Sequence, residues 1–151
     1  MQHVRKLPLL VLVLFVACIS AGALSPEGAA HELRRVFTEG DARGLKMLLS
    51  EKSRVKVRVM VTSLKSLEGK QLQNVAAYYG VKPGELSVLT VDVFLASYIN
   101  RESGRVLGKV LQSKIAGIDR QKTRARVHFS GGAALDFVRE GPYWKFDMTK
   151  L

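Results

Sequence analysis

The chain has 151 residues, 47% of them hydrophobic, and its 24 lysines and arginines outnumber 13 acidic residues to give a net charge of +11. This size fits one globular domain, and the apolar content excludes a disordered polyelectrolyte. The positive charge indicates an anionic environment or partner without identifying it.

The first 23 residues have the pattern of a targeting segment. Arg5 and Lys6 provide a basic start, an apolar run covers residues 7–19, and small residues follow it. The run is shorter than the roughly 18 residues that a membrane-spanning helix requires. Since Ala23 ends a string of small residues that suits a signal peptidase, we expect a secretory signal peptide over 1–23, cleaved before Leu24, and a periplasmic or extracellular protein.

Cys18 provides an alternative to this cleavage site. The three residues before it, 15–17, resemble a bacterial lipoprotein box, in which the signal covers 1–17 and the acylated cysteine anchors the protein to a membrane. Otherwise Cys18 is a small apolar residue in a discarded segment. Cleavage before Leu24 leaves 128 residues with a net charge of +9 and removes the only cysteine. Disulfides and thiolate metal ligands are then excluded from the single domain predicted over 24–151.

Local start and stop signals predict two helices at the beginning of this domain. Ser25 is a suitable N-cap, Pro26 suits the first helical position, and Gly40 provides a C-terminal stop. Asp41 can cap a second helix. The apolar residues of the two segments recur at helical spacing: Ala29, Leu33, Val36, Phe37, Leu45, Leu48 and Leu49.

The middle of the chain is less uniform. Residues 55–61 alternate β-branched and basic side chains, which predicts a strand with one face in the core. A helix continuing from Ser53 is the alternative, because no turn signal separates this run from the segment after it. Helices are predicted over 69–79 and 90–100, with a loop at 80–84 between them.

From Gly104 onward the pattern has period two, and turn residues are spaced as in an antiparallel meander. A three-residue loop at 130–132 pairs Val127 with Leu135 and places apolar side chains on one face.

A second turn, of two residues at 140–141, pairs Phe137 with Trp144 and selects the same apolar face. The opposite face then aligns three charged residues across three strands: Arg126, Asp136 and Lys145.

The order of elements and a few motifs resemble the nuclear transport factor 2-like superfamily. The motifs are Phe37, Gly40-Asp41, Leu45, Leu48-Leu49 and the closing segment 139–147. This superfamily includes SnoaL-like and ketosteroid-isomerase-like domains and exported bacterial proteins and lipoproteins of unknown role. The resemblance implies an α+β, cystatin-like fold in which N-terminal helices pack on a curved antiparallel sheet to form a cone around a pocket. It also implies a dimer as one possible assembly.

An enzymatic site is one consequence to consider. In the isomerase branch, the resemblance implies a carboxylate base inside the pocket and phenol or acid donors to an enolate oxygen. Asp92 is the candidate carboxylate and Tyr98 the candidate donor, with Tyr78 and Tyr79 as further phenols. No catalytic motif of that branch matches residue by residue. The alternative is that Asp92 interacts with a helix dipole and the tyrosines are core aromatics.

Basic residues are the most distinctive chemical feature and concentrate in segments 52–70 and 105–126. Two sets are predicted to lie on strand faces: Lys56 and Arg58 on one, and Lys122, Arg124, Arg126 and His128 on the other. Adjacent strands would join them into a surface suited to anionic lipids or glycans. The alternative is a solvated face that keeps the domain soluble.

Other partners are not expected. His31 and His128 have no nearby cysteine or paired carboxylates, so no metal or other cofactor is expected. The basic rows lack interleaved aromatic residues for base stacking, so nucleic acid is not expected.

Three functional hypotheses follow from these patterns. The first is an exported, non-catalytic domain that binds a small ligand or an envelope partner, in part through the basic face. The second is an isomerase or dehydratase with a carboxylate in the pocket, which requires Asp92 to point into a closed cavity. The third is a scaffold subunit of an envelope or secretion assembly. The fold alone does not choose among them.

Overall fold

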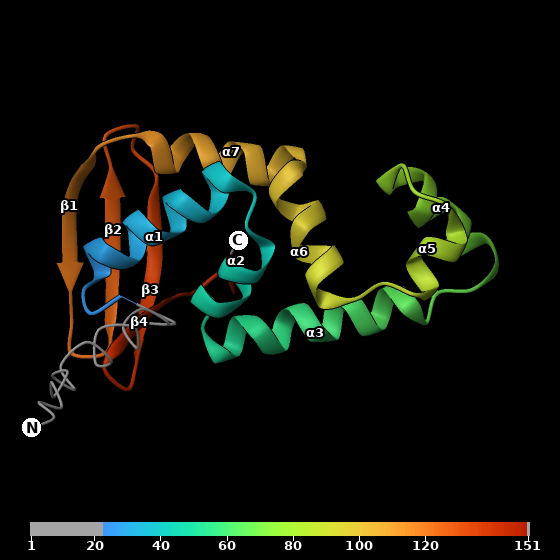
Figure 1. Cartoon of the computed structure of the whole chain (residues 1–151), viewed down its shortest axis with the longest axis horizontal. Helices are drawn as coiled ribbons and strands as arrows, with labels where there is room; N and C mark the ends of the chain where they lie inside the picture. Colours follow the sequence, from blue (N-terminus) through green and yellow to red (C-terminus); the bar gives the residue numbers. More distant parts are fainter. Residues whose placement is uncertain (1–22, 151) are drawn as a thin grey trace, which may run out of the picture.

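The structure is a computed structural model that describes residues 23–150, so residues 1–22 of the predicted signal peptide, Cys18 included, lie outside the described residues. It is an α+β fold, as predicted, with seven helices and one antiparallel sheet in the described part (Figure 1). The helices are α1 (Pro26–Glu39), α2 (Ala42–Leu48), α3 (Glu51–Lys65), α4 (Gly69–Tyr79), α5 (Pro83–Ser87), α6 (Val91–Asn100) and α7 (Glu102–Gln112). The strands are β1 (Ile115–Arg120), β2 (Arg124–Phe129), β3 (Ala134–Glu140) and β4 (Tyr143–Phe146).

The first two helices begin where their caps predicted. The Ser25 hydroxyl accepts a hydrogen bond from the Gly28 amide at 3.0 Å, and the Asp41 carboxylate accepts one from the Gly44 amide at 2.8 Å. Gly40 ends α1 in the left-handed conformation, with φ of 68°. Each cap satisfies amide groups that the helix itself leaves without partners.

The strand predicted over 55–61 is wrong: this segment lies within helix α3, the alternative that the sequence left open. Ser50 caps α3 by accepting from the Ser53 amide at 3.2 Å. Val57 and Val61, four residues apart, are buried on one face. The same sequence therefore satisfies period two and period 3.6, and the cap together with the buried face decides for the helix.

The segment from Gly104 to residue 112 was predicted to begin the strand meander, and this is wrong as well. It belongs to α7, whose Leu107 and Leu111 are buried. The glycine serves close helix packing: a Cβ at Gly104 would lie 2.1 Å from the carbonyl oxygen of Tyr98 in α6. No turn occurs there, and period two begins only at β1.

The sheet has the order β1-β2-β3-β4, which confirms the meander for residues 115–146. Val127 pairs with Leu135, so the register predicted for the first hairpin is confirmed. The second register is wrong, because Phe137 pairs with Phe146 and not with Trp144.

The cause is the position of the second turn. Glu140 pairs with Tyr143, so the two turn residues are Gly141 and Pro142, and Gly141 has φ of 60°. A type II′ hairpin turn requires this positive φ at its first central position, where glycine is favoured. Moving the turn by one residue changes each pairing by two, which preserves the faces but separates Lys145 from Asp136. Lys145 is buried instead, and its Nζ donates to the carbonyl of Met47 at 2.8 Å.

The core begins between the inner face of the sheet and helix α1, and it continues along the buried faces of α2, α3, α6 and α7 (Figure 1). The largest side chains buried there are Trp144, Phe137, Phe146 and Leu33. Ala23 extends this half of the fold, because its carbonyl accepts from the Trp144 amide at 2.8 Å. On the other side of the molecule, α4 and α5 project beyond α3 and α6 (Figure 1).

Candidate functional site

The largest cavity described is a groove of about 540 Å³ formed by α3, α5, α6 and the segments that flank α5. Its lining is mostly apolar, and two of the helices that form it, α5 and α6, lie away from the sheet (Figure 1). Helix α3 contributes Met60 and Leu64, which are four residues apart and therefore share a face. Leu86 of α5 and Leu89, in the segment that follows α5, also line the groove.

Helix α6 forms the opposite wall because it carries two apolar faces. Leu95 and Ile99 are buried in the core, whereas Val93 and Phe94 line the groove. Val93 is 57% exposed despite its apolar side chain. A soluble protein rarely leaves such residues together at the surface unless they meet a ligand or a partner.

Arg101, at the junction of α6 and α7, is the basic residue of this lining. Its Nε donates to the Ser97 hydroxyl at 2.8 Å and its Nη2 to the Tyr79 carbonyl at 3.0 Å. The guanidinium carbon also lies 4.2 Å from the centroid of the Tyr79 ring. Among the described residues, no carboxylate lies within 4.0 Å of it, so the charge is held in place but not neutralised by an acid.

Tyr98 and Glu85 are two further polar residues of the lining, which also includes Ser97 and Ser103. Burial raises the pKa of the Tyr98 phenol, which therefore stays protonated at neutral pH. Glu85 is the acidic residue of the lining, and its carboxylate accepts from the Lys82 amide at 3.0 Å to cap α5. The groove thus combines a large apolar surface with a few fixed polar groups, the usual composition of a small-molecule site.

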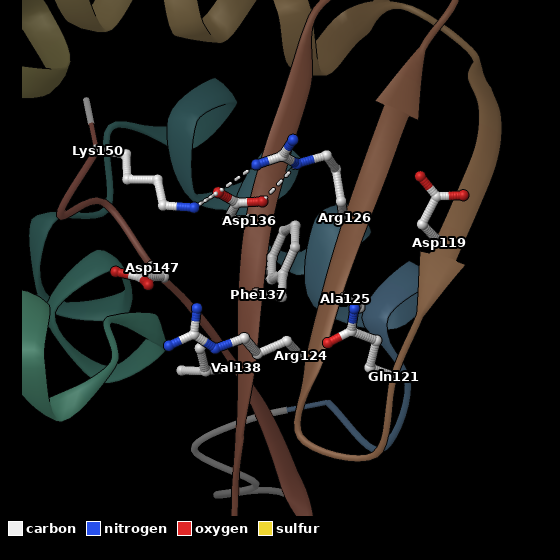
Figure 2. A pocket seen from close by; sticks show the side chains of 10 residues that line it. All are labelled: Asp119, Gln121, Arg124, Ala125, Arg126, Asp136, Phe137, Val138, Asp147 and Lys150. Carbon is white, nitrogen blue, oxygen red and sulfur yellow. Dashed lines mark hydrogen bonds and ion pairs between the residues drawn. The ribbon is translucent and has the colours of Figure 1, made fainter.

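A second cavity, of about 330 Å³, lies on the outer face of the sheet (Figure 2). Arg126 on β2 donates two hydrogen bonds, of 2.7 and 3.0 Å, to the carboxylate of Asp136 on β3, and Lys150 donates to the same carboxylate at 3.0 Å. These contacts, led by the hydrogen bond from Arg126, lower the pKa of Asp136 from 3.8 to about 2. Figure 2 shows the three charges turned toward one another.

The predicted basic surface is only partly assembled. Lys122 lies in the turn between β1 and β2, and Arg124 begins β2 and lines the outer cavity (Figure 2). Arg126 is paired with Asp136, and His128 lies 2.7 Å from the carboxylate of Asp119. Acids on neighbouring strands therefore contact two of the four residues of the predicted row, Arg126 and His128.

The other predicted pair of cations lies on helix α3 and not on a strand. Lys56 donates to the carbonyl of Thr149 at 2.9 Å, and Arg58 forms an ion pair with Glu51 at 3.1 Å. Strand pairing therefore does not align Lys56 and Arg58 with the row on β2, because α3 is helical.

The residues proposed for catalysis are not brought together. Asp92 and Tyr98 both lie on α6. They are six positions apart in the sequence, so their side chains point about 120° apart around the helix axis. Tyr98 lines the groove, whereas Asp92 lines neither cavity and pairs with Lys46 at 2.9 Å on the surface. The other two phenols differ as well: Tyr78 is exposed, and Tyr79 packs against Arg101.

Sequence reasoning missed the groove and its charged residue. The signal was present in Val88, Met60 and Val93, which are apolar and exposed, but each belongs to a different segment. Arg101 follows a predicted helix and carries no motif. Only packing of α5 against α3 and of α3 against α6 brings these residues around one cavity.

Comparison with known proteins provides no relative for this chain: no family model, no curated protein and no solved structure matches it. The resemblance to the nuclear transport factor 2-like superfamily therefore stays a prediction. Within residues 23–150, no helix has the length and apolarity needed to cross a membrane. The same residues contain no group of three or more His, Cys, Asp or Glu side chains positioned to hold a metal ion.

Proposed function

We propose that this protein is an exported, non-catalytic domain that binds a small molecule with a large apolar part in the groove between α3, α5 and α6. The observation that carries the proposal is the cavity itself: about 540 Å³, lined mainly by apolar side chains from three helices. Small-molecule sites commonly have volumes of roughly 300–1,000 Å³ and this kind of lining. The outer cavity is a weaker candidate, because it is smaller and its charged groups already neutralise one another.

The non-catalytic part of the proposal rests on where the acid lies. General acid-base chemistry requires a carboxylate within hydrogen-bond reach of the bound substrate. Asp92 is exposed and paired with Lys46. Glu85 lines the groove, but its carboxylate is engaged by a backbone amide. A ligand held there would meet apolar walls and fixed hydrogen bonds, which favours binding over turnover.

The proposal also includes three predictions from the sequence: export, membership of the nuclear transport factor 2-like superfamily, and a cone-shaped arrangement. The contacts of Ala23 favour a cleavage site upstream of that residue. Its carbonyl bonds to Trp144, and a Cβ added at Gly28 would lie 3.1 Å from the Ala23 side chain. Cleavage before Leu24 would remove these contacts, whereas processing at Cys18 would keep them.

A fluorescent probe tests the binding proposal. The neutral, apolar dye N-phenyl-1-naphthylamine should bind the purified protein saturably, with enhanced emission. Met60→Lys places a charged head in the groove and should weaken binding about tenfold or more, which corresponds to about 1.4 kcal/mol.

Val59→Lys is the matched control. Val59 is the neighbouring residue on α3, is 59% exposed and does not line the groove. The control should leave dye affinity unchanged. Absence of saturable binding, or equal weakening by both substitutions, would contradict the proposal.

A further inference from the structure

From the position of Arg101 we infer that the ligand is a single-chain amphiphile with an anionic head, a carboxylate or a phosphate. This inference rests on the proposed function and identifies the class of ligand for the same groove. The apolar chain lies against α3 and α6, and the head binds the guanidinium at the junction of α6 and α7.

The hydrogen bonds of Arg101 are the first part of the argument. A guanidinium has five N–H donors. Arg101 directs one to the Ser97 hydroxyl and one to the Tyr79 carbonyl, which leaves three without a hydrogen-bond partner among residues 23–150. The two bonds that are made hold the side chain in place. The remaining donors are fixed in a planar fork, which matches carboxylate and phosphate oxygens better than a flexible ammonium does.

The charge around Arg101 is the second part. It is half-buried beside apolar residues, and water therefore screens it less than an exposed cation. The other neighbours of the guanidinium are uncharged, namely the Tyr79 ring and the Ser97 hydroxyl. Glu85 also lines the groove, but it is engaged at the N-terminus of α5 and forms no ion pair with Arg101. An anionic head supplies the missing countercharge and an apolar chain covers the exposed walls, so one amphiphile satisfies both features.

Ligands that differ only in the head group test this inference on the unmodified protein. Dodecanoate, dodecyl phosphate and dodecyltrimethylammonium should displace the neutral dye below their micelle concentrations, and dodecanol should displace it below its solubility limit. We expect the two anions to bind about tenfold tighter than dodecanol, and the cation to bind weakest, because only an anionic head gains charge-assisted hydrogen bonds from Arg101. Comparison of the affinities for dodecanoate and dodecyl phosphate distinguishes a fatty acid from a lysophospholipid as the source of the head.

Two arginine substitutions assign the effect to one side chain. Arg101→Met should abolish the preference for anions, so that dodecanoate and dodecanol bind this variant with affinities within about twofold of each other. Arg105→Met removes the same charge one helical turn further along, from a residue that does not line the groove, and should keep the preference. Equal loss in both variants would overturn the assignment to Arg101.

The outcomes distinguish this inference from the function on which it rests. If all four amphiphiles displace the dye equally, or if the cation binds tightest, the groove binds apolar chains but the inference of an anionic head is wrong. If neither dye nor amphiphile binds, the proposed function itself fails. Self-association that Met60→Lys abolishes would assign the groove to a second copy of the chain and overturn both. The unmodified protein alone decides the head-group preference, so the inference stays testable even if Arg101→Met perturbs the fold.

Discussion

The sheet half of this molecule and its α4–α5 arm are built in opposite ways. In the sheet half, the side chains of Trp144, Phe137 and Phe146 are almost fully buried against α1. In the arm, Ala76 and Leu86 are the buried residues of α4 and α5. The arm reaches the rest of the fold through the packing of α5 on α3 and the hydrogen bond from Arg101 to Tyr79.

This difference separates stability from binding. A closely packed apolar core contributes most of the free energy of folding, and it leaves no space for a ligand. The groove lies where packing is incomplete, between the arm and helices α3 and α6. Segments with few buried contacts also open at lower free-energy cost, so the arm is suited to admit a ligand.

The largest expected effect tests the core. Trp144→Ala should lower the free energy of unfolding by about 3–5 kcal/mol, because it removes a large, fully buried side chain. Urea denaturation measures this loss. Trp144→Phe should cost less, since it keeps an aromatic ring and removes the indole Nε1, a buried donor that has no partner among the described residues.

Leu86→Ala provides the matched substitution in the arm. It should increase hydrogen exchange in α4 and α5 and leave the global urea midpoint nearly unchanged, because Leu86 does not belong to the core cluster that contains Trp144. A shift of the midpoint as large as that of Trp144→Ala would mean that the two regions unfold as one unit.

A smaller effect concerns acid sensitivity, which we assign to the sheet half. The folded pKa of Asp136, about 2, is below its unfolded value near 3.8, so the ionised form stabilises the fold above pH 4. That stabilisation is lost as pH falls from 3.8 to 2. Asp136→Asn should cost about 1 kcal/mol at pH 7, after allowance for solvent screening, and nothing near pH 2. Urea denaturation across this pH range measures the difference, and a constant difference would contradict the linkage.

Dye binding is the control for Asp136→Asn. The ion pairs of Asp136 lie on the outer face of the sheet (Figure 2), and none of the residues that form them lines the groove. Affinity for the dye at pH 7 should therefore stay unchanged. Weaker binding would show that the two regions are coupled.

The smallest effect concerns the edge of the sheet. A chain that begins at Leu24 should be about 0.5 kcal/mol less stable to urea than one that begins at Ala23, because it lacks the hydrogen bond to the Trp144 amide. A chain that begins at Gly22 should be as stable as the chain that begins at Ala23. Equal stability of all three chains would remove the structural argument for processing upstream of Ala23.

Local signals predicted some elements better than others. Helices α1 and α2 follow from Ser25 and Asp41, because a cap and the helix that it starts are adjacent in the sequence. The first hairpin follows for the same reason, since a short turn fixes its register. Helix α3 was misjudged because its valines fit both periods, and α7 because Gly104 signals a turn in the sequence but a close contact in the fold.

The candidate site is the part that local signals did not reach. Met60, Leu89, Phe94 and Arg101 carry no motif, and each is unremarkable in its own segment. Their common feature is the cavity between helices that are distant in the sequence.

By itself the sequence determined the α+β class, the capped helices, the apolar face of the sheet and the excess of positive charge, because each depends on residue type or on near neighbours. Tertiary structure decided what near neighbours left open: that α3 buries its valines as a helix, that Asp136 and Asp119 contact part of the basic row, and that Arg101 lies beside an apolar groove. Burial, charge pairing and cavities arise from contacts between distant segments, and their energies are set only when those segments meet.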